Sequence, residues 1–225
     1  MSARLRTTLT AVTAAALAAA GGVLSSSASA ATGDVFGGQA AGTVFYPNPV
    51  QQLGIQTLTD NKDADYPALA PAYRRVILTD LDASGTLTGK YVTVKSKTGT
   101  PARMVNGAFP VWHRDADQFE QVMGYYWVTT AQHYLLSLGF GSSLRPVNQR
   151  QIELRIDQFG GDNSFFREDK ANITLGKGGV DDAEDAEVII TSTATPYRTA
   201  RCLASAPTSS RARSARASAT TSRWW

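Results

Sequence analysis

All acidic residues of this chain lie in its middle part, which predicts that the folded core spans residues 31–190. The 225 residues include 19 Asp and Glu, all of which lie between Asp34 and Glu187. The same range holds 14 Lys and Arg, so it carries a net charge of −5 although the whole chain carries +3. We therefore predict an acidic globular body with two basic ends that need separate explanations.

The composition excludes several classes of protein. Hydrophobic residues make up 43% of the chain, enough to bury a core, which excludes wholesale disorder. After the N-terminal segment no apolar run reaches the roughly 18 residues of a membrane span, so a polytopic membrane protein is excluded. Cys202 is the single cysteine, which excludes a disulfide framework and a cysteine-based zinc site.

The N-terminal end has the three parts of a secretory signal. Arg4 and Arg6 precede an alanine-rich apolar stretch, and Ala28 and Ala30 place small residues before a cleavage point. We predict that residues 1–30 are a signal peptide and that the mature chain is secreted; a disordered leader is the alternative. Export without a disulfide means that packing or bound ions must stabilise the body.

The first half of the body shows strand patterns. Residues 31–45 are rich in Gly and Ala and are expected to be a loose lead-in. Two β-branched segments, 75–79 and 90–94, flank a turn rich in Asp, Ser and Gly, which predicts a β-hairpin. The turn is similar to the start of a calcium loop, but Tyr91 stands where the bidentate glutamate would be, so a plain turn is favoured.

Residues 115–139 change to a helical period. Apolar residues recur at steps of three and four, Asp115 or Asp117 can cap the start, and Gly139 can end the helix in a left-handed conformation. We predict a helix of about five turns with one buried face. His133 is interpreted as a core or boundary residue rather than a metal ligand, and the aromatic residues 125–127 as core.

The second half of the body continues as strands and then a helix. Residues 151–157 alternate between apolar and polar, which is typical of a half-buried strand, and two further extended segments follow at 163–166 and 173–175. The Gly-Lys pair after them lacks the rest of a phosphate loop. The acids of 181–187 are expected to open a helix, because negative charges interact favourably with the positive N-terminal end of the helix dipole.

The composition changes abruptly at Thr191. The last 35 residues contain 8 Ala, 7 Ser, 7 Thr and 6 Arg but no Gly, Val, Ile, Asp or Glu. Such a segment carries no period and cannot bury a core, so residues 191–225 are predicted to be a disordered basic tail. The arginines follow no nucleic-acid-binding motif, and no nucleic-acid partner is predicted.

Three segments of the body resemble secreted zinc metallopeptidases of the thermolysin and fungalysin type. Residues 176–190 read GKGGVDDAEDAEVII and are similar to the segment just before the zinc-binding motif of that family. Residues 163–166, NSFF, resemble the edge strand that binds the substrate backbone, and residues 125–140 resemble the long helix before it. The resemblance covers roughly 45–190 and rests on order and spacing.

The resemblance implies an α+β fold and a set of site residues. The body would be the β-rich N-terminal lobe of such a peptidase, with one long helix and the start of the active-site helix. Asn163 and Ser164 would contact an extended peptide substrate, although an ordinary edge strand or turn is an equal alternative. Glu187 would be a vestigial calcium ligand, since the family has a calcium-binding acid at this place.

The residues that would do the chemistry are missing. In the family the next residues are H-E-x-x-H, whose histidines share one helix face and bind zinc while the glutamate acts as general base. This chain has Thr191-Ser192-Thr193-Ala194-Thr195 instead, and it has no histidine after His133. Zinc is therefore not expected to bind.

We predict that a shift of the reading frame caused the loss; a tail made by selection is the alternative. If residues 190–195 are encoded ATC-ACG-AGT-ACG-GCC-ACG, one C inserted after the first codon gives CAC-GAG-TAC-GGC-CAC, which encodes HEYGH. The restored frame can also encode a glutamate opposite Arg216, 25 positions after the first histidine, where the family has its third zinc ligand. The frameshift can be natural or a sequencing error.

The predicted function is therefore a fragment of a secreted zinc metalloendopeptidase, inactive as written. Its partner in the intact family would be an extended peptide or protein substrate, and no membrane contact is expected beyond export. Two alternatives stay open. One is a secreted β-rich binding module with a natural flexible basic tail, and the other is a surface binder that uses this tail on anionic partners.

Overall fold

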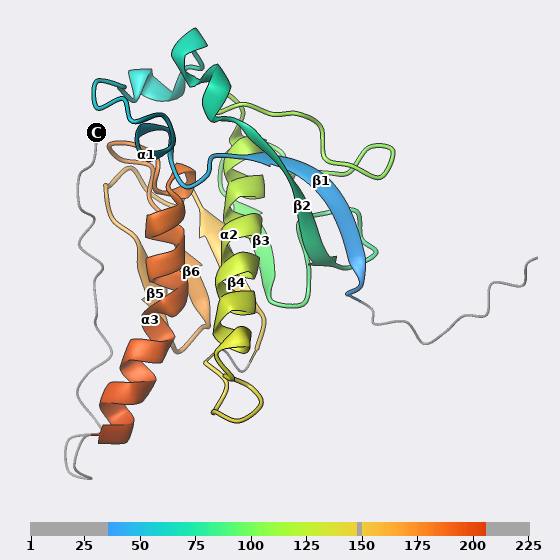
Figure 1. Ribbon diagram of the computed structural model, residues 1–225, viewed down its shortest axis with the longest axis vertical. Helices are drawn as coiled ribbons and strands as arrows, with labels where there is room; N and C mark the ends of the chain where they lie inside the picture. Colours follow the sequence, from blue (N-terminus) through green and yellow to red (C-terminus); the bar gives the residue numbers. More distant parts are fainter. Residues whose placement is uncertain (1–35, 148–149, 206–225) are drawn as a thin grey trace, which may run out of the picture. The chain divides into compact units, whose positions relative to one another are not determined.

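The computed structural model describes residues 36–147 and 150–205 (Figure 1). They form two β-sheets and several helices, which is compatible with the predicted α+β class. The predicted signal peptide and residues 206–225 of the predicted tail lie outside the described residues.

Helix α2 (Asp117–Ser137) lies at the centre of the fold and confirms the helix predicted over 115–139 (Figure 1). Its N-cap is Ala116, which makes no side-chain capping bond, so neither predicted aspartate caps it. Gly139 follows the helix with φ of 92°, in the left-handed region expected there. The predicted core positions are confirmed only in part. Tyr126 and Thr130 are half-buried and His133 and Ser137 are exposed, whereas these residues of the helix are buried: Phe119, Val122, Met123, Tyr125 and Trp127.

Strands β1 (Gly38–Val44) and β2 (Arg74–Leu81) form an antiparallel two-stranded ribbon. The expectation of a loose lead-in over 31–45 is therefore wrong for residues 38–44, and residues 31–35 lie outside the described residues. Small residues are needed here because β1 passes close to α2: a Cβ added at Gly42 would lie 2.8 Å from Cγ1 of Val122. The Gly and Ala content reflects this close packing rather than disorder.

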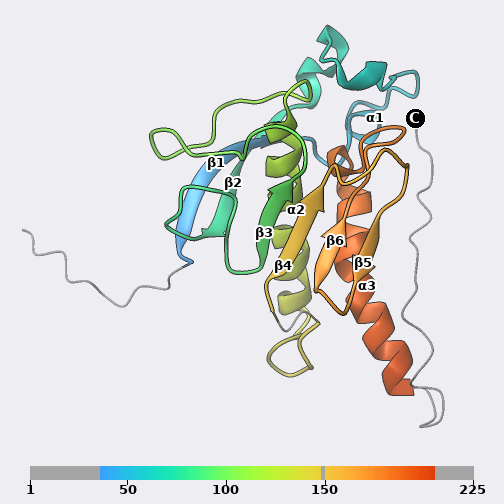
Figure 2. The same cartoon turned by 180° about the vertical axis from the view of Figure 1, so that it is seen from behind.

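A second sheet has four strands in the order β3-β4-β6-β5 (Figure 2). Strands β3 (Val92–Ser96), β4 (Ile152–Ile156) and β6 (Asn172–Thr174) are parallel neighbours, and β5 (Phe165–Arg167) pairs antiparallel with β6 at one edge. The alternating strand predicted over 151–157 is confirmed as β4, whose alternate residues are buried.

The hairpin predicted from 75–79 and 90–94 is wrong, although both strands exist. Strand β2 pairs with β1, and β3 pairs with β4 from a distant part of the chain. The segment between them closes on itself through isolated bridges such as Leu81 with Gly89 and Thr88 with Thr93. The buried face of β4 offers β3 a continuation of the core, which a short-range partner does not.

Helices α2 and α3 (Ala186–Ser205) pack against each other and against one face of the four-stranded sheet (Figures 1 and 2). Helix α2 contacts β3 and β4, whereas α3 contacts β5. Between β1 and β2 the chain forms three short helices around a small separate core of Val50, Leu58 and Leu69: α1 (Pro49–Leu53), η1 (Asn61–Asp63) and η2 (Pro67–Ala72). Within the described ranges, no helix is long and apolar enough to cross a bilayer.

Two expectations about the end of the body need correction. The acids of 181–187 open a helix only in part: three of them lie in or just before a 3-10 turn, η3 (Asp182–Glu184), and α3 begins at Ala186. Asp185 accepts a hydrogen bond from the N–H of Glu187 in the first turn of α3 at 2.8 Å. Helix α3 then continues through Ser205, so residues 191–205 are helical where disorder was predicted. Ser192 and Thr193 are buried, which shows that small polar residues suffice where a helix side packs closely.

Candidate functional site

The acid-rich turn before α3 lies inside the protein, and its carboxylates bind different parts of the fold. Asp182 accepts a hydrogen bond from the hydroxyl of Ser164 at the start of β5. Asp185 accepts one from the side-chain amide of Asn48 at 3.4 Å. Burial raises the pKa of Asp182 to about 6, and the bond from Ser164 offsets only part of this rise. The turn thus joins β5 and α1 to the base of α3.

Glu184 forms a buried ion pair with Arg114. Its carboxylate receives two bonds from Arg114, at 3.1 Å from Nε and 2.7 Å from Nη2. The same guanidinium also binds Asp60, at 2.6 Å to the carboxylate and 2.8 Å to the backbone carbonyl. The Arg114 side chain is only 1% exposed, so it holds the loop of Asp60 against the turn in a bidentate, desolvated geometry.

The structure separates the two residues predicted to bind substrate. Asn163 is exposed directly before β5. Ser164 is fully buried, and its hydroxyl is used by Asp182, so its side chain positions the turn rather than a peptide. Among the residues that the structure describes, strand β5 pairs only with β6, so it lies at an edge of the sheet. The other backbone edge is the kind of edge to which an extended peptide adds as a strand.

Helix α3 places the positions of the missing zinc motif on one side. Thr191 is exposed and Thr195 is half-buried, and the hydroxyl of Thr195 donates to the carbonyl of Thr191 at 2.9 Å. Ser192 and Thr193 point into the packed interior. Residues at positions 191 and 195 therefore share a helix face with access to solvent, and these are the positions that the resemblance assigns to two histidines.

Glu187, the predicted vestigial calcium ligand, is exposed in the first turn of α3. Its backbone N–H donates to the carboxylate of Asp185 at 2.8 Å. Within the part of the chain that the structure describes, it belongs to no group of three side chains that could hold a metal together.

Such a group does exist elsewhere, and sequence reasoning missed it. One carboxylate oxygen from each of Glu120, Asp157 and Asp181 lies within 4.8 Å of the other two, and all three residues are buried. Burial, followed by the neighbouring charges, raises the pKa of both Glu120 and Asp181. The available signal was an acid on the core face of α2 and another directly after the last buried residue of β4.

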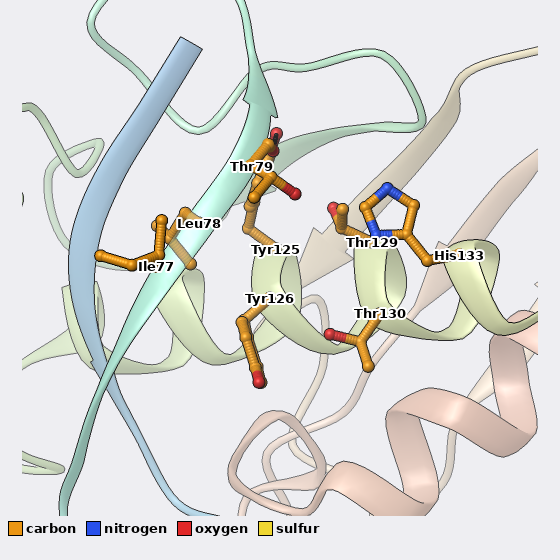
Figure 3. A pocket seen from close by; sticks show the side chains of 8 residues that line it. All are labelled: Ile77, Leu78, Thr79, Tyr125, Tyr126, Thr129, Thr130 and His133. Carbon is orange, nitrogen blue, oxygen red and sulfur yellow. Dashed lines mark hydrogen bonds between the residues drawn. The ribbon is translucent and has the colours of Figure 1, made fainter. Parts of the chain in front are cut away.

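A pocket of about 180 Å³ lies between β2 and α2 (Figure 3). His133 lines it and forms an ion pair with Asp80, 2.8 Å from Nε2 to the carboxylate. Tyr125 donates from its hydroxyl to the carbonyl of Thr79 at 2.8 Å. His133 is exposed, so it lies at the rim of the fold rather than in its core.

No protein-family model matches the chain, and no curated protein is significantly similar to it.

Proposed function

We propose that this chain is the N-terminal part of a secreted zinc metalloendopeptidase that has lost its zinc ligands and catalytic glutamate through a shift of the reading frame. The order of the three resembling segments supports the proposal. The contacts among those segments support it further, because helix α3 contacts both the long helix α2 and the edge strand β5.

The observation that carries the proposal is the geometry of α3 beside β5. Thr191 and Thr195 lie one turn apart, exposed and half-buried, on a helix that contacts β5, an edge strand of the four-stranded sheet. Histidines at this spacing bind one zinc ion, so the backbone is suited to the motif whereas the side chains are not. Threonine hydroxyls do not replace imidazoles as zinc ligands, and no catalytic step follows from the residues present.

Inserting one base after codon 190 tests the proposal. We expect the lengthened protein to bind zinc and to hydrolyse casein, and we expect a chelator to abolish the hydrolysis. The matched control carries glutamine in place of the restored catalytic glutamate; it should still bind zinc but lose the activity. A gene sequence across codons 188–196 that cannot be read as HEYGH in any frame would contradict the proposal.

One observation favours the alternative of a binding module that folds as written. Helix α3 runs fifteen residues past the change in composition, and Ser192 and Thr193 are buried in it. Under this alternative the open edge of β5 serves to bind an extended partner without hydrolysis. The inserted-base protein distinguishes the two, because a binding module gains no zinc-dependent peptidase activity.

A further inference from the structure

Glu120, Asp157 and Asp181 come together from three different elements. Glu120 lies in the first turn of α2, Asp157 directly follows β4, and Asp181 is the N-cap of η3. Each is buried, with 3–4% of its surface exposed. Three carboxylates in one water-poor place repel each other, so the arrangement needs a compensating positive charge.

The described residues provide no such charge. None of their ion pairs joins a lysine, arginine or histidine to any of the three acids. Arg114, the buried cation of this region, is fully used by Glu184, Asp60 and Asp63. The groups that raise the pKa of Glu120 after burial itself are other acids, first Asp181 and then Asp157.

Two oxygens of the group also have no hydrogen-bond partner. Oε2 of Glu120 and Oδ1 of Asp157 are inaccessible to solvent and receive no hydrogen bond in the part of the chain that the structure describes. The other oxygen of Asp157 is held in place by the hydroxyls of Ser96 and Thr98. A buried carboxylate that is oriented on one side and unpartnered on the other indicates a ligand on the open side.

We propose that Glu120, Asp157 and Asp181 bind a single hard divalent cation of the size of Ca²⁺. All donors are carboxylate oxygens, which Ca²⁺ and Mg²⁺ prefer and which soft metals do not. The limit of 4.8 Å between oxygens is about twice a Ca²⁺–O distance, so one ion can contact all three residues. This site is separate from the positions assigned to zinc and from Glu187, and it does not depend on the proposed peptidase function.

The cation ties the start of α3 to the rest of the fold. Asp181 also accepts a hydrogen bond from the N–H of Ala183 at 3.3 Å, so an ion on its carboxylate holds the η3 turn against α2 and β4. Export without a disulfide is compatible with this way of stabilising a fold, because extracellular modules bind Ca²⁺ at about 0.1–1 mM.

Calcium titration of the full chain tests the site. After removal of metals with a chelator, CaCl₂ is titrated by calorimetry and the melting temperature is followed in parallel. We expect one Ca²⁺ per chain and a melting temperature that rises with its concentration. Glu120→Gln keeps the shape of the side chain and should raise the Kd for Ca²⁺ at least about tenfold, because it removes one ligand charge.

The metal-free variants separate a cation site from a structural hydrogen-bond network. Without Ca²⁺, Glu120→Gln should melt at the same or a higher temperature than the parent, because it removes a buried acid that the neighbouring acids repel when it ionises. Asp181→Asn, which keeps an oxygen for the N–H of Ala183, should behave in the same way and serves if the first variant does not fold. Glu168→Gln, an exposed acid, is the matched control and should leave the Kd unchanged.

Three results would overturn the proposal. The first is no heat and no change in melting temperature up to about 10 mM CaCl₂, above the range of extracellular calcium modules. The second is Ca²⁺ binding that Glu120→Gln and Asp181→Asn leave unchanged. The third is a lower melting temperature of both variants without metal, which would mean that the three acids share protons in a purely structural network.

Discussion

The buried Arg114 pairs with acids from two distant parts of the chain, Asp60 and Glu184. Burial raises the pKa of Glu184 to about 8, and the contact with Arg114 offsets only part of this rise. Removing the guanidinium would leave both Glu184 and Asp60 without a counter-charge. Desolvated pairs of this kind are costly to break from one side.

We predict that Arg114→Met lowers the free energy of unfolding by about 3–5 kcal/mol. Urea denaturation followed by tryptophan fluorescence measures the change. Adding Glu184→Gln to this variant should recover part of the loss, because the orphaned charge is then removed. The control, Arg167→Met, changes a half-exposed arginine and should stay within about 0.5 kcal/mol; an equal loss in both variants would contradict the assigned role.

Single residues in the site differ in how visible they are in the sequence. Asn163 and Glu187 each lie in a short segment of contiguous residues, so the sequence alone was enough to single them out. That Asn163 contacts substrate and that Glu187 is a calcium ligand both stay predictions. Glu120 and Asp157 carry no such motif. Their relation to Asp181 arises only when α2, β4 and the η3 turn are placed side by side.

The two loops at the end of the four-stranded sheet pack backbone against backbone. A Cβ added at Gly176 would lie 2.1 Å from the carbonyl oxygen of Gly161, and one at Gly178 would lie 2.5 Å from the backbone nitrogen of Asp162. Lys177 also donates to the carbonyl of Phe159 at 3.1 Å. This contact positions the start of β5 and the acid-rich turn relative to each other.

We predict that Gly176→Ala destabilises the protein by about 1–3 kcal/mol, because the obstructing atom is backbone and cannot rotate away. Chemical denaturation measures the loss. Gly160→Ala is the matched control, since a Cβ there meets nothing within 4 Å, and it should be neutral. Unchanged stability of Gly176→Ala would mean that the two loops do not pack as described.

The helices and strands that depend on residues within one segment could be predicted from the sequence, whereas those that depend on distant segments could not. Helix α2 and strand β4 follow from periodic patterns within one segment, and both were correct. Strand β1 was missed, because its Gly and Ala residues have a reason only once α2 passes close by. The pairing of β2 and β3 was wrong, because a short turn suggests a hairpin while the sheet is decided by distant partners.

Helix α3 connects the acidic body to the segment beyond the change in composition. Only its first five residues, Ala186–Ile190, belong to the body predicted from the sequence, and an isolated helix of that length is not stable. Ile189, Ser192 and Thr193 are all buried on the packed side. The contacts that hold α3 therefore extend across Thr191.

We predict that a chain ending at Ile190 melts about 4–8 °C below a chain ending at Ser205, which corresponds to about 2 kcal/mol for a domain of this size. Differential scanning calorimetry of the two proteins checks this, and limited proteolysis should cut the shorter chain faster. Equal melting temperatures would mean that residues 31–190 fold alone.

The sequence by itself determined which parts of the chain are apolar and periodic, where the composition changes, and which family the motifs resemble, because these are properties of neighbouring residues. The tertiary structure decided which strands pair, that the acids before α3 face inward, and that α3 continues past Thr191. It also decided that Glu120, Asp157 and Asp181 meet. Burial and contact between distant segments set these outcomes, and neither is encoded in any single stretch of the chain.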